Sequence, residues 1–594
     1  MFLLTLAFGA VSAAAQVTPP DVPSVAKNTV RTFEVTSPVT RMKPNAFDFG
    51  TITTTTRLGV QTAQPLSLTL DEAIRRALAN NNDIEVSRTS ERIQEQQIQS
   101  LLGQYDPVFT ATPTYSRSQS TGNKATNDLR VSSNFSGFIR PGGGNYQTFF
   151  NNNRTESAFA QSQASSGTVS SGNSALYTSS LGVAYTQPLF RNLGIDSRRL
   201  NISIAKKRLE QSDTDFRLQA TKTVTSVQQG YWDLVFALRN QQNVQANVTL
   251  AKENLRQIEA RIDAGAAAPL ERASIDTELA TREGDLLSAT QQVSIAENAL
   301  KQLILRDPTA PEWQQSIVPV DKPVFSQDVT DLNSAMQDAV ANRFELKRLK
   351  IEGEVNALNL RYYKNQLKPQ VDLNTQFSLN GLSSGGTSSA FSTTLYNSTA
   401  DLRLFNGINQ IRALPSVNLP LLVNDSILVP ASPSYLFGGF NRSLSNIFRT
   451  DAPNFSVGVT FSFPLRNRTA KADYAAAKIT TEQVAAQTRG QEQVVVVDVR
   501  NAVQAVETSR QLVLTSRRAR ESAEIQLDGE RKLYDAGRST TFLLFQRENA
   551  LTNARNAEVR AETDYNKALA DLQRATATSF RAHNITVDSP VVVK

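Results

Sequence analysis

Few residues in this chain have the types and spacing that chemistry at an active site requires. Its 594 residues include one histidine, His583, and no cysteine. These counts exclude a thiol nucleophile, disulfides and cysteine-ligated metal. His583 lies near the C-terminus and is predicted to be a solvated tail residue. The sequence also lacks a phosphate-binding glycine loop, a metal-ligand cluster and a suitably spaced carboxylate pair, so it predicts no catalytic, metal-binding or cofactor-binding residues and no enzyme activity.

Two other groups resemble functional residues but are better explained by structure. Asp106 precedes Pro107 and is interpreted as part of a helix stop, because the residue before a proline is disfavoured in a helix. Tyr231 and Trp232 lie in a long helical stretch and are interpreted as packing residues.

The formal net charge of +7 comes from interspersed charges, which is typical of solvated helix faces. Attraction for anionic partners is the alternative.

The N-terminal segment predicts export. Residues 1–10 are mostly apolar and are followed by Ala13, Ala14 and Ala15, so residues 1–15 are predicted to be a signal peptide. No later run of about 18 apolar residues occurs. A mature chain that spans a membrane would then do so as a closed β-barrel, since only helices and closed barrels satisfy every backbone group in lipid. Residues 16–66 are predicted to be an extended arm or linker.

The chain contains one pattern twice. Residues 73–80 resemble residues 335–342, and the same offset of 262 residues relates Pro107 to Pro369. Further landmarks keep their order, and these are Pro188 with Pro464, Gly265 with Gly537, Leu279 with Leu551, and Leu300 with Leu572. Each copy is predicted to run helix, strand, loop, strand, long helix, turn and helix. The predicted boundaries are 67–310 for the first copy, 311–330 for a linker, 331–578 for the second copy and 579–594 for a tail.

Four segments alternate apolar and polar residues in the way that is typical of membrane-spanning strands. The period of two is strict in residues 177–185, 371–379 and 455–463, and weaker in residues 108–117, which contain Pro113. A half-exposed strand of a soluble sandwich would show the same pattern. Because bacterial single-chain barrels have at least eight strands, four strands in a membrane predict an oligomer.

The segments between paired strands are long and mostly polar. Residues 119–174 and 381–453 are rich in glycine, serine and asparagine, and they are predicted to be loops outside the cell. The second loop also contains the apolar residues 419–423. These would cover the mouth of a barrel or pack on a neighbouring subunit, and the sequence does not choose between the two.

Two stretches without proline, 194–262 and 469–534, predict helices of roughly 100 Å each at 1.5 Å per residue. Apolar residues recur in the first stretch at steps of three and four, as in the seam of a coiled coil; they are Val224, Val227, Tyr231, Leu234 and Leu238. Each stretch stops at a glycine, Gly265 or Gly537, which marks a turn. Each long helix is therefore predicted to fold back onto a shorter antiparallel partner.

These features together resemble the TolC family of outer-membrane efflux proteins over about residues 67–578. The motifs are residues 68–74 with 79–81, the strand-to-helix junctions 187–190 and 463–465, and the turns at Gly265 and within 534–540. The resemblance implies an α+β membrane protein: a homotrimer with a twelve-stranded barrel, four strands per chain, and antiparallel coiled-coil helices that form a periplasmic tunnel. The implied function is passive export through the outer-membrane channel of a tripartite efflux or type I secretion system. Its implied partners are a periplasmic adaptor and an inner-membrane pump, with no nucleic acid.

The resemblance also implies gate residues at the two turns. In the family an aromatic residue three positions before the second turn glycine bonds an acidic residue six positions after the first, which here are Tyr534 and Glu271. Packing at the helix end is the alternative role for Tyr534. Where relatives often carry an acidic ring, this chain has Leu543 and Gln546, so the acidic gate is not carried over. The candidate gate residues are Gly265, Glu271, Tyr534, Gly537, Arg538, Leu543 and Gln546.

Two other classes of protein stay open. An exported trimeric coiled-coil adhesin or structural envelope protein would need one passenger region and one anchor. Here strands interrupt the helices twice, at matching positions. A secreted enzyme is disfavoured by the lack of a catalytic constellation, although a pair of carboxylates brought together by folding would escape a reading of the sequence.

Overall fold

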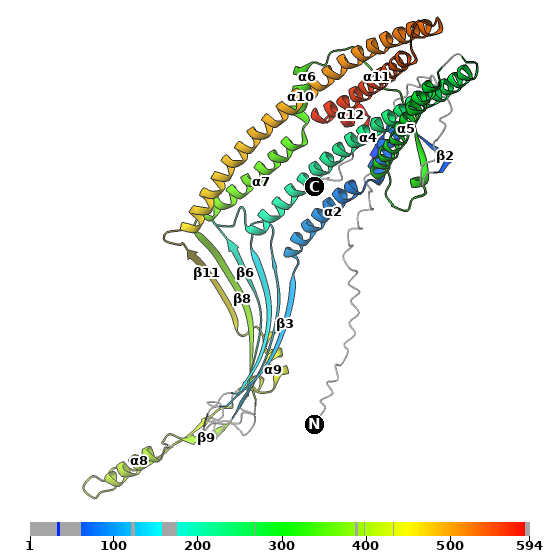
Figure 1. Cartoon of the computed structure of the whole chain (residues 1–594). Helices are drawn as coiled ribbons and strands as arrows, with labels where there is room; N and C mark the ends of the chain where they lie inside the picture. Colours follow the sequence, from blue (N-terminus) through cyan, green and yellow to red (C-terminus); the bar gives the residue numbers. More distant parts are fainter. Residues whose placement is uncertain are drawn as a thin grey trace, which may run out of the picture. The chain divides into compact units, whose positions relative to one another are not determined.

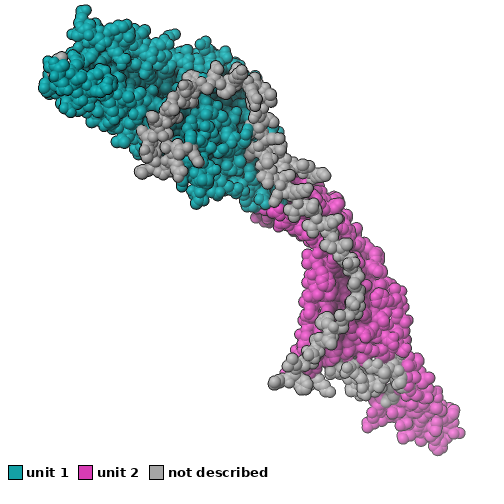
Figure 2. All heavy atoms as spheres, turned by 90° about the vertical axis from the view of Figure 1, so that its right-hand side faces the viewer, with its two compact units in different colours: residues 1–95, 207–354, 482–594 teal, residues 96–206, 355–481 magenta. Residues whose placement is uncertain are grey.

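The computed structural model describes residues 33–35, 61–119, 121, 125–156, 175–265, 268–385, 390–396, 398–431 and 433–587. The predicted signal peptide, 1–15, lies outside them. The chain divides into two compact units (Figure 2). Unit 1 takes its described residues from Met1–Glu95, Lys207–Glu354 and Glu482–Lys594, and unit 2 from Gln96–Lys206 and Val355–Thr481.

The two long helices end just before Gly265 and Gly537, as the sequence predicted. Helix α4 (Ser197–Asp263) has 67 residues and α10 (Arg468–Asp535) has 68, and the shorter α5 (Pro269–Ile304) and α11 (Thr541–Ala575) follow them. Two further pairs of consecutive helices are α1 (Leu70–Asn80) with α2 (Asn82–Leu102), and α6 (Leu332–Asn342) with α7 (Phe344–Gln366). Within the described ranges, no helix combines the length and apolar character needed to cross a membrane.

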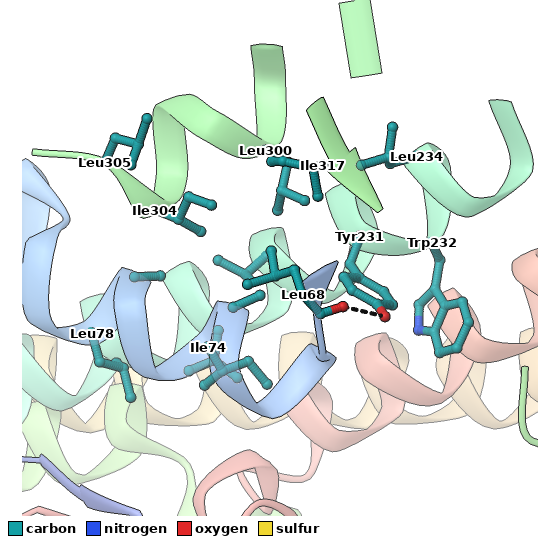
Figure 3. Close-up of a cluster of buried hydrophobic side chains, with 14 of the residues drawn as sticks. Leu68, Ile74, Leu78, Tyr231, Trp232, Leu234, Leu300, Ile304, Leu305 and Ile317 are labelled. Atoms are coloured by element: carbon teal, nitrogen blue, oxygen red, sulfur yellow. Dashed lines mark hydrogen bonds between the residues drawn. The ribbon is translucent and has the colours of Figure 1, made fainter. Parts of the chain in front are cut away.

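The core of unit 1 confirms the packing role of Tyr231 and Trp232. The five predicted seam residues of α4 are all buried. They pack with Ile74 and Leu78 of α1 and with Leu300 of α5 (Figure 3). The Tyr231 hydroxyl donates to Leu68 O at 3.1 Å and lies 2.9 Å from Asp321 Oδ2. Because the hydroxyl also accepts from the Asp321 N–H at 3.2 Å, it is satisfied as donor and as acceptor, and the ring can be fully buried.

The segments predicted as arm, linker and tail contain short strands that join one another. Strand β1 (Phe33–Val35) pairs antiparallel with β12 (Ile585–Val587), and β2 (Gln61–Leu68) pairs parallel with β7 (Gln315–Pro319). These strand pairs add detail that the predicted arm, linker and tail did not include. They escape prediction because each strand gains its hydrogen bonds from a segment far away in the sequence.

The prediction that His583 is a solvated tail residue is wrong. Its Nδ1 lies 3.2 Å from Asp71 Oδ1, and its Nε2 contacts the Gln228 side chain. The histidine side chain is 13% exposed. Its hydrogen bond with Asp71 lowers the pKa of that carboxyl. The predicted tail therefore packs on α1 and α4 through α12 (Ser579–Ala582) and its neighbours.

Unit 2 is built on one antiparallel sheet, with the strand order β11-β8-β6-β5-β4-β3 (Figure 1). The strands are β3 (Val108–Ser118), β4 (Thr126–Phe138), β5 (Asn145–Glu156), β6 (Ala175–Pro188), β8 (Gln370–Ser384) and β11 (Pro453–Ser462). Four of them cover the strands predicted from alternation, including β3 with its proline.

The other two strands correct the sequence analysis. Segment 119–174 is not a single loop, because it contains β4 and β5, and the sheet has six strands rather than four. The alternation in β5 is weak, since Asn151, Asn152 and Asn153 place polar side chains on both faces. Strand β5 pairs with β4 on one side and with β6 on the other. This pairing supplies its hydrogen bonds, and the local sequence pattern does not predict it.

The strand registers place most of the apolar strand residues on one face of the sheet. Directly paired positions run from Phe109 through Phe135, Thr148, Val183 and Phe377 to Phe455. The neighbouring positions along each strand, such as Asn134, Gln376 and Ser456, belong to the opposite, polar face. We call these the apolar face and the polar face. In this chain Phe109 is 68% and Phe455 74% exposed.

Segment 381–453 contains several short elements beyond the end of β8. They are β9 (Phe391–Thr394), α8 (Thr399–Arg412), β10 (Ser426–Val429) and α9 (Phe440–Ile447). Helix α9 packs on the end of β8, where Asn446 Nδ2 donates to Leu382 O at 2.8 Å. The apolar residues Leu419, Leu421 and Val423 are exposed in this chain.

Candidate functional site

The predicted gate residues lie at the two turns of unit 1, and their geometry begins with the backbone. Gly265 and Gly537 have φ of +73° and +70°, the left-handed conformation that favours glycine. After α10, the Gly537 N–H donates to Tyr534 O at 2.9 Å and the Arg538 N–H donates to Leu533 O at 2.8 Å. This pair of bonds is a Schellman motif, which satisfies the carbonyls at the end of the helix. Arg538 therefore acts here through its backbone.

A substitution at Gly537 tests this turn. Nothing lies within 4 Å of a Cβ added at Gly537, so only its positive φ opposes a side chain. Gly537→Ala should therefore cost about 1–2 kcal/mol through the left-handed conformation alone. Thermal unfolding of the purified protein should detect the loss. Gly529→Ala, in the interior of α10 with nothing near its Cβ, is the matched control and should be neutral or stabilising. Equal effects of the two variants would contradict the role of the turn.

Tyr534 contacts a partner other than the predicted one. Its hydroxyl accepts a hydrogen bond from Arg261 Nη1 at 2.8 Å and lies 3.5 Å from Thr541 Oγ1. Glu271 takes no part in these contacts, so the predicted Tyr534–Glu271 bond is not present in this structure. Arg261 belongs to the last turn of α4, whereas Glu271 lies beyond the glycine turn in the first turn of α5. A phenol facing a guanidinium serves as the acceptor, so the proton of the hydroxyl stays available for Thr541.

The other two predicted gate residues lie on the exposed side of α11. Leu543 and Gln546 are exposed, whereas Leu544 and Phe545 between them are buried. This side of α11 also carries Phe542, which is 74% exposed. The structure thus brings Tyr534 and Gly537 together with Arg261 and leaves Glu271, Leu543 and Gln546 outside that group.

Behind Tyr534 lies a cavity of about 520 Å³ between the four helices of the turns. Its apolar lining comes from Ile258, Ile275, Leu544 and Phe545, and its polar lining includes Arg261, Arg531, Tyr534 and Glu548. Ile258, Ile275 and Phe545 also form a small buried cluster of their own. The cavity combines both kinds of surface, and its polar groups carry both signs of charge.

A buried ion pair at this cavity was not predicted from the sequence. Arg282 of α5 and Glu548 of α11 are 4% and 3% exposed. Arg282 donates to Glu278 Oε1 at 2.8 Å and to Asn247 O at 3.2 Å, and its Nη2 lies 3.7 Å from Glu548 Oε2. The spacing of Glu278 and Arg282 was the one available signal, since residues four apart share a helix face. The partnership with α11 depends on the tertiary fold.

Burial raises the pKa of Glu548, although Arg282 and Arg531 nearby act in the opposite direction. A folded-state pKa above the ordinary 4.5 means that protonation of Glu548 stabilises the fold. This contribution is fully present below about pH 4.5 and is lost as the pH rises through the folded-state pKa. Acidification should therefore stabilise the packing of the helices around the cavity.

Glu548→Gln should remove this pH dependence, because the amide resembles the protonated acid. At pH 7 the variant should show slower hydrogen exchange in α11 than the natural protein, and at pH 4 the difference should vanish. Glu521→Gln, at a side chain that is 64% exposed, is the control and should match the natural protein at both values. Faster exchange in Glu548→Gln at pH 7 would show that the ion pair outweighs the cost of burying the carboxylate.

Across the described ranges, no group of three or more histidine, cysteine or acidic side chains could hold a metal ion. Around the turns, the described side chains hold the helices together and include no nucleophile beside a general base.

A family model for outer membrane efflux proteins matches residues 73–304 and 423–578, well over half of the chain. The chain belongs to the outer membrane efflux protein family. The resemblance inferred from the sequence is thereby confirmed, and with it the outer membrane as the place of action.

Solved structures of outer-membrane channels share the fold of this efflux protein. The Campylobacter jejuni channel CmeC is 14% identical, with a TM-score of 0.56, covering 86% of this chain and 86% of that chain. The open state of Neisseria gonorrhoeae MtrE is 14% identical, with a TM-score of 0.55, covering 86% and 89%. Vibrio cholerae VceC is 13% identical, with a TM-score of 0.54, covering 85% and 95%. At these identities the likeness concerns the fold alone. No curated protein matches the sequence.

Proposed function

We propose that this efflux protein is one subunit of a homotrimeric exit duct, through which a tripartite efflux or type I secretion system passes cargo passively out of the cell. The observation that carries the proposal is the sheet of unit 2. Its registers put Phe109, Phe135, Val183, Phe377 and Phe455 on one face and polar residues on the other. A wall between lipid and water needs this division.

The edges of the sheet support assembly from several copies. β3 and β11 each pair with a strand on one side only within the described residues. In lipid an unpaired edge leaves backbone groups without partners, at a cost of several kcal/mol for each group. One chain with six strands falls short of the eight that the smallest bacterial barrels use. Pairing between copies removes both difficulties.

The helix turns are the proposed periplasmic end of the duct. A periplasmic adaptor and an inner-membrane pump are its proposed partners there, as family membership suggests. The segments between β3 and β4 and between β5 and β6 are proposed to face the outside of the cell, together with residues 385–452. Transport needs no catalytic group in this chain, since the pump supplies the energy and the duct supplies a path.

Three measurements on one preparation test the proposal. Cell fractionation should place the protein in the outer membrane, mass measurement in detergent should give three copies, and planar bilayers should show single-channel conductance. A monomer that still conducts ions would contradict the trimer. A trimer without conductance would favour the alternative, an exported coiled-coil adhesin or structural envelope protein, which has no reason to form pores.

A further inference from the structure

The hairpin of β4 and β5 is built into the sheet along its whole length. β4 pairs with β3 from Thr126 to Ser136, and β5 pairs with β6 from Asn145 to Glu156. The two hairpin strands pair with each other between Leu129 and Phe138. No direct pairing between β3 and β6 occurs in this sheet, because the hairpin stands between them.

Strand β4 of the hairpin continues the two faces of the sheet, whereas β5 carries the polar residues Asn152 and Arg154 on the apolar face near one end. Leu129, Val131 and Phe135 of β4 lie on the apolar face, in register with Tyr115, Pro113 and Phe109 of β3. Asp128, Arg130 and Asn134 lie on the polar face, in register with Ser116, Thr114 and Thr110. An element lying on the sheet as a lid would not repeat its two-sided pattern in register.

The turn of the hairpin, residues 139–144, is fixed to the end of β6 and the start of α4. The Gln187 side chain donates to Gly142 O at 2.9 Å, and Arg198 Cζ lies 3.5 Å from the centre of the Phe138 ring. A Cβ on Gly143 would come within 2.9 Å of Asn192 O, and its φ is +70°. The turn therefore requires glycine at a close approach, and it holds the hairpin at the level of its neighbours.

From this geometry we propose that three copies of the chain close a barrel of eighteen strands, with β11 of each copy paired to β3 of the next. The inference rests on the proposed trimeric duct and adds the composition of its wall. Strands in the sheet alternate in direction. With six per chain, β3 and β11 run in opposite directions, as antiparallel pairing between copies requires.

The added hairpin sets the width of the outer mouth. Strands about 4.8 Å apart and tilted by about 40° each occupy about 6.3 Å of a barrel's circumference. Twelve strands then give a wall diameter of about 24 Å, and eighteen give about 36 Å. A barrel of the larger size leaves a water-filled passage. The hairpin thus makes the mouth 1.5 times as wide, and the mouth admits cargo that a twelve-stranded barrel would stop.

Deleting residues 126–156 should convert one wall into the other. Removing two strands leaves β3 and β6 antiparallel to each other. The registers place Phe109 of β3 at the level of Val183 of β6, so the apolar and polar faces of the two strands still match. Electron microscopy of the detergent-solubilised protein, viewed along the three-fold axis, should show a wall of about 36 Å in the full chain. The deletion variant should be narrower by a factor of 1.5. A wall of about 24 Å in the full chain would overturn the proposal even if the variant fails to fold.

Engineered cysteine pairs give a second test of whether the hairpin lies in the wall, because the chain has no cysteine of its own. Thr112 and Ser180 lie at one level of the sheet, joined through Ser132 and Asn151. Three strand spacings, about 14 Å, separate them in the full chain, which is too far for a disulfide. The pair Thr112→Cys with Ser180→Cys should therefore stay unlinked in the full chain and link in the deletion variant. A link in the full chain would place the hairpin outside the wall.

Pairing between copies has its own test. Thr112→Cys combined in turn with Ser456→Cys, Gly458→Cys or Thr460→Cys should link subunits for at least one combination. No link in any combination, in a protein that is trimeric and conducts ions, would contradict the β3–β11 contact. A protein that is neither trimeric nor conducting would instead contradict the proposed duct, and the Thr112–Ser180 result would still report on the hairpin.

Discussion

Replacing Arg282 with methionine should lower the free energy of opening of the helices around the turn cavity by about 3–5 kcal/mol. The side chain is 4% exposed and bonds Glu278 and the backbone of Asn247. Methionine fills a similar volume but leaves Glu548 buried, with Arg531 Nη2 at 3.9 Å as its remaining cationic neighbour. A buried charge that loses its partner costs far more than an exposed one. Hydrogen exchange in α5 and α11 should become about 100-fold faster or more, at 1.36 kcal/mol for each factor of ten.

The matched control is Arg272→Met on the same helix. Arg272 is 59% exposed and bonds Glu259 at 3.2 Å, so its loss should cost at most about 1 kcal/mol. A double variant separates charge from packing. Adding Glu548→Gln to Arg282→Met removes the stranded carboxylate and should recover much of the lost protection. If the double variant exchanges as fast as Arg282→Met alone, the effect comes from lost packing and not from the buried charge.

The parts of the fold that could be predicted are those that local backbone geometry or strict periodicity determines. Gly537 ends α10 because the Schellman turn needs a positive φ, and this demand is visible in the sequence alone. Strand β11 alternates without exception from Phe455 to Phe461 because one face of the edge strand is apolar throughout. The hairpin of β4 and β5 escaped prediction because positions such as Asn152 and Arg154 place polar groups on the apolar face near one end.

The site was predictable in its position but not in its contacts. The glycine turns located Tyr534, since the turn follows it directly. Its hydrogen-bond partner depends on how α4 lies beside α10, and Arg261 occupies that place rather than Glu271. Likewise, Arg282 and Glu548 are far apart in the sequence, and they lie on helices whose buried faces meet only after folding. Residue type and spacing give the candidates for such a pair, and tertiary packing selects among them.

Phe377→Arg should strongly reduce assembly of the channel in the outer membrane, whereas Gln376→Arg should leave it nearly unchanged. Phe377 lies on the apolar face of the inner strand β8, in register with Val183 and Phe455, and it is 48% exposed in the single chain. Its two directly paired residues, Val183 and Phe455, carry no acidic group that could form an ion pair with a guanidinium. A lipid-facing arginine costs about 2–4 kcal/mol near the middle of the bilayer, and less near its surfaces.

Gln376 is the matched control because it is adjacent, exposed and on the polar face. Its arginine variant would meet water inside the duct, so the charge stays solvated. Phe377→Leu is a second control, since it keeps the apolar character and changes the shape alone. Assembly is read as the trimer recovered from outer-membrane fractions, and stability as urea unfolding in lipid vesicles. Equal losses for the two arginine variants would mean that the apolar face does not meet lipid, and a larger loss for Gln376→Arg would mean that the proposed inside and outside of the wall are reversed.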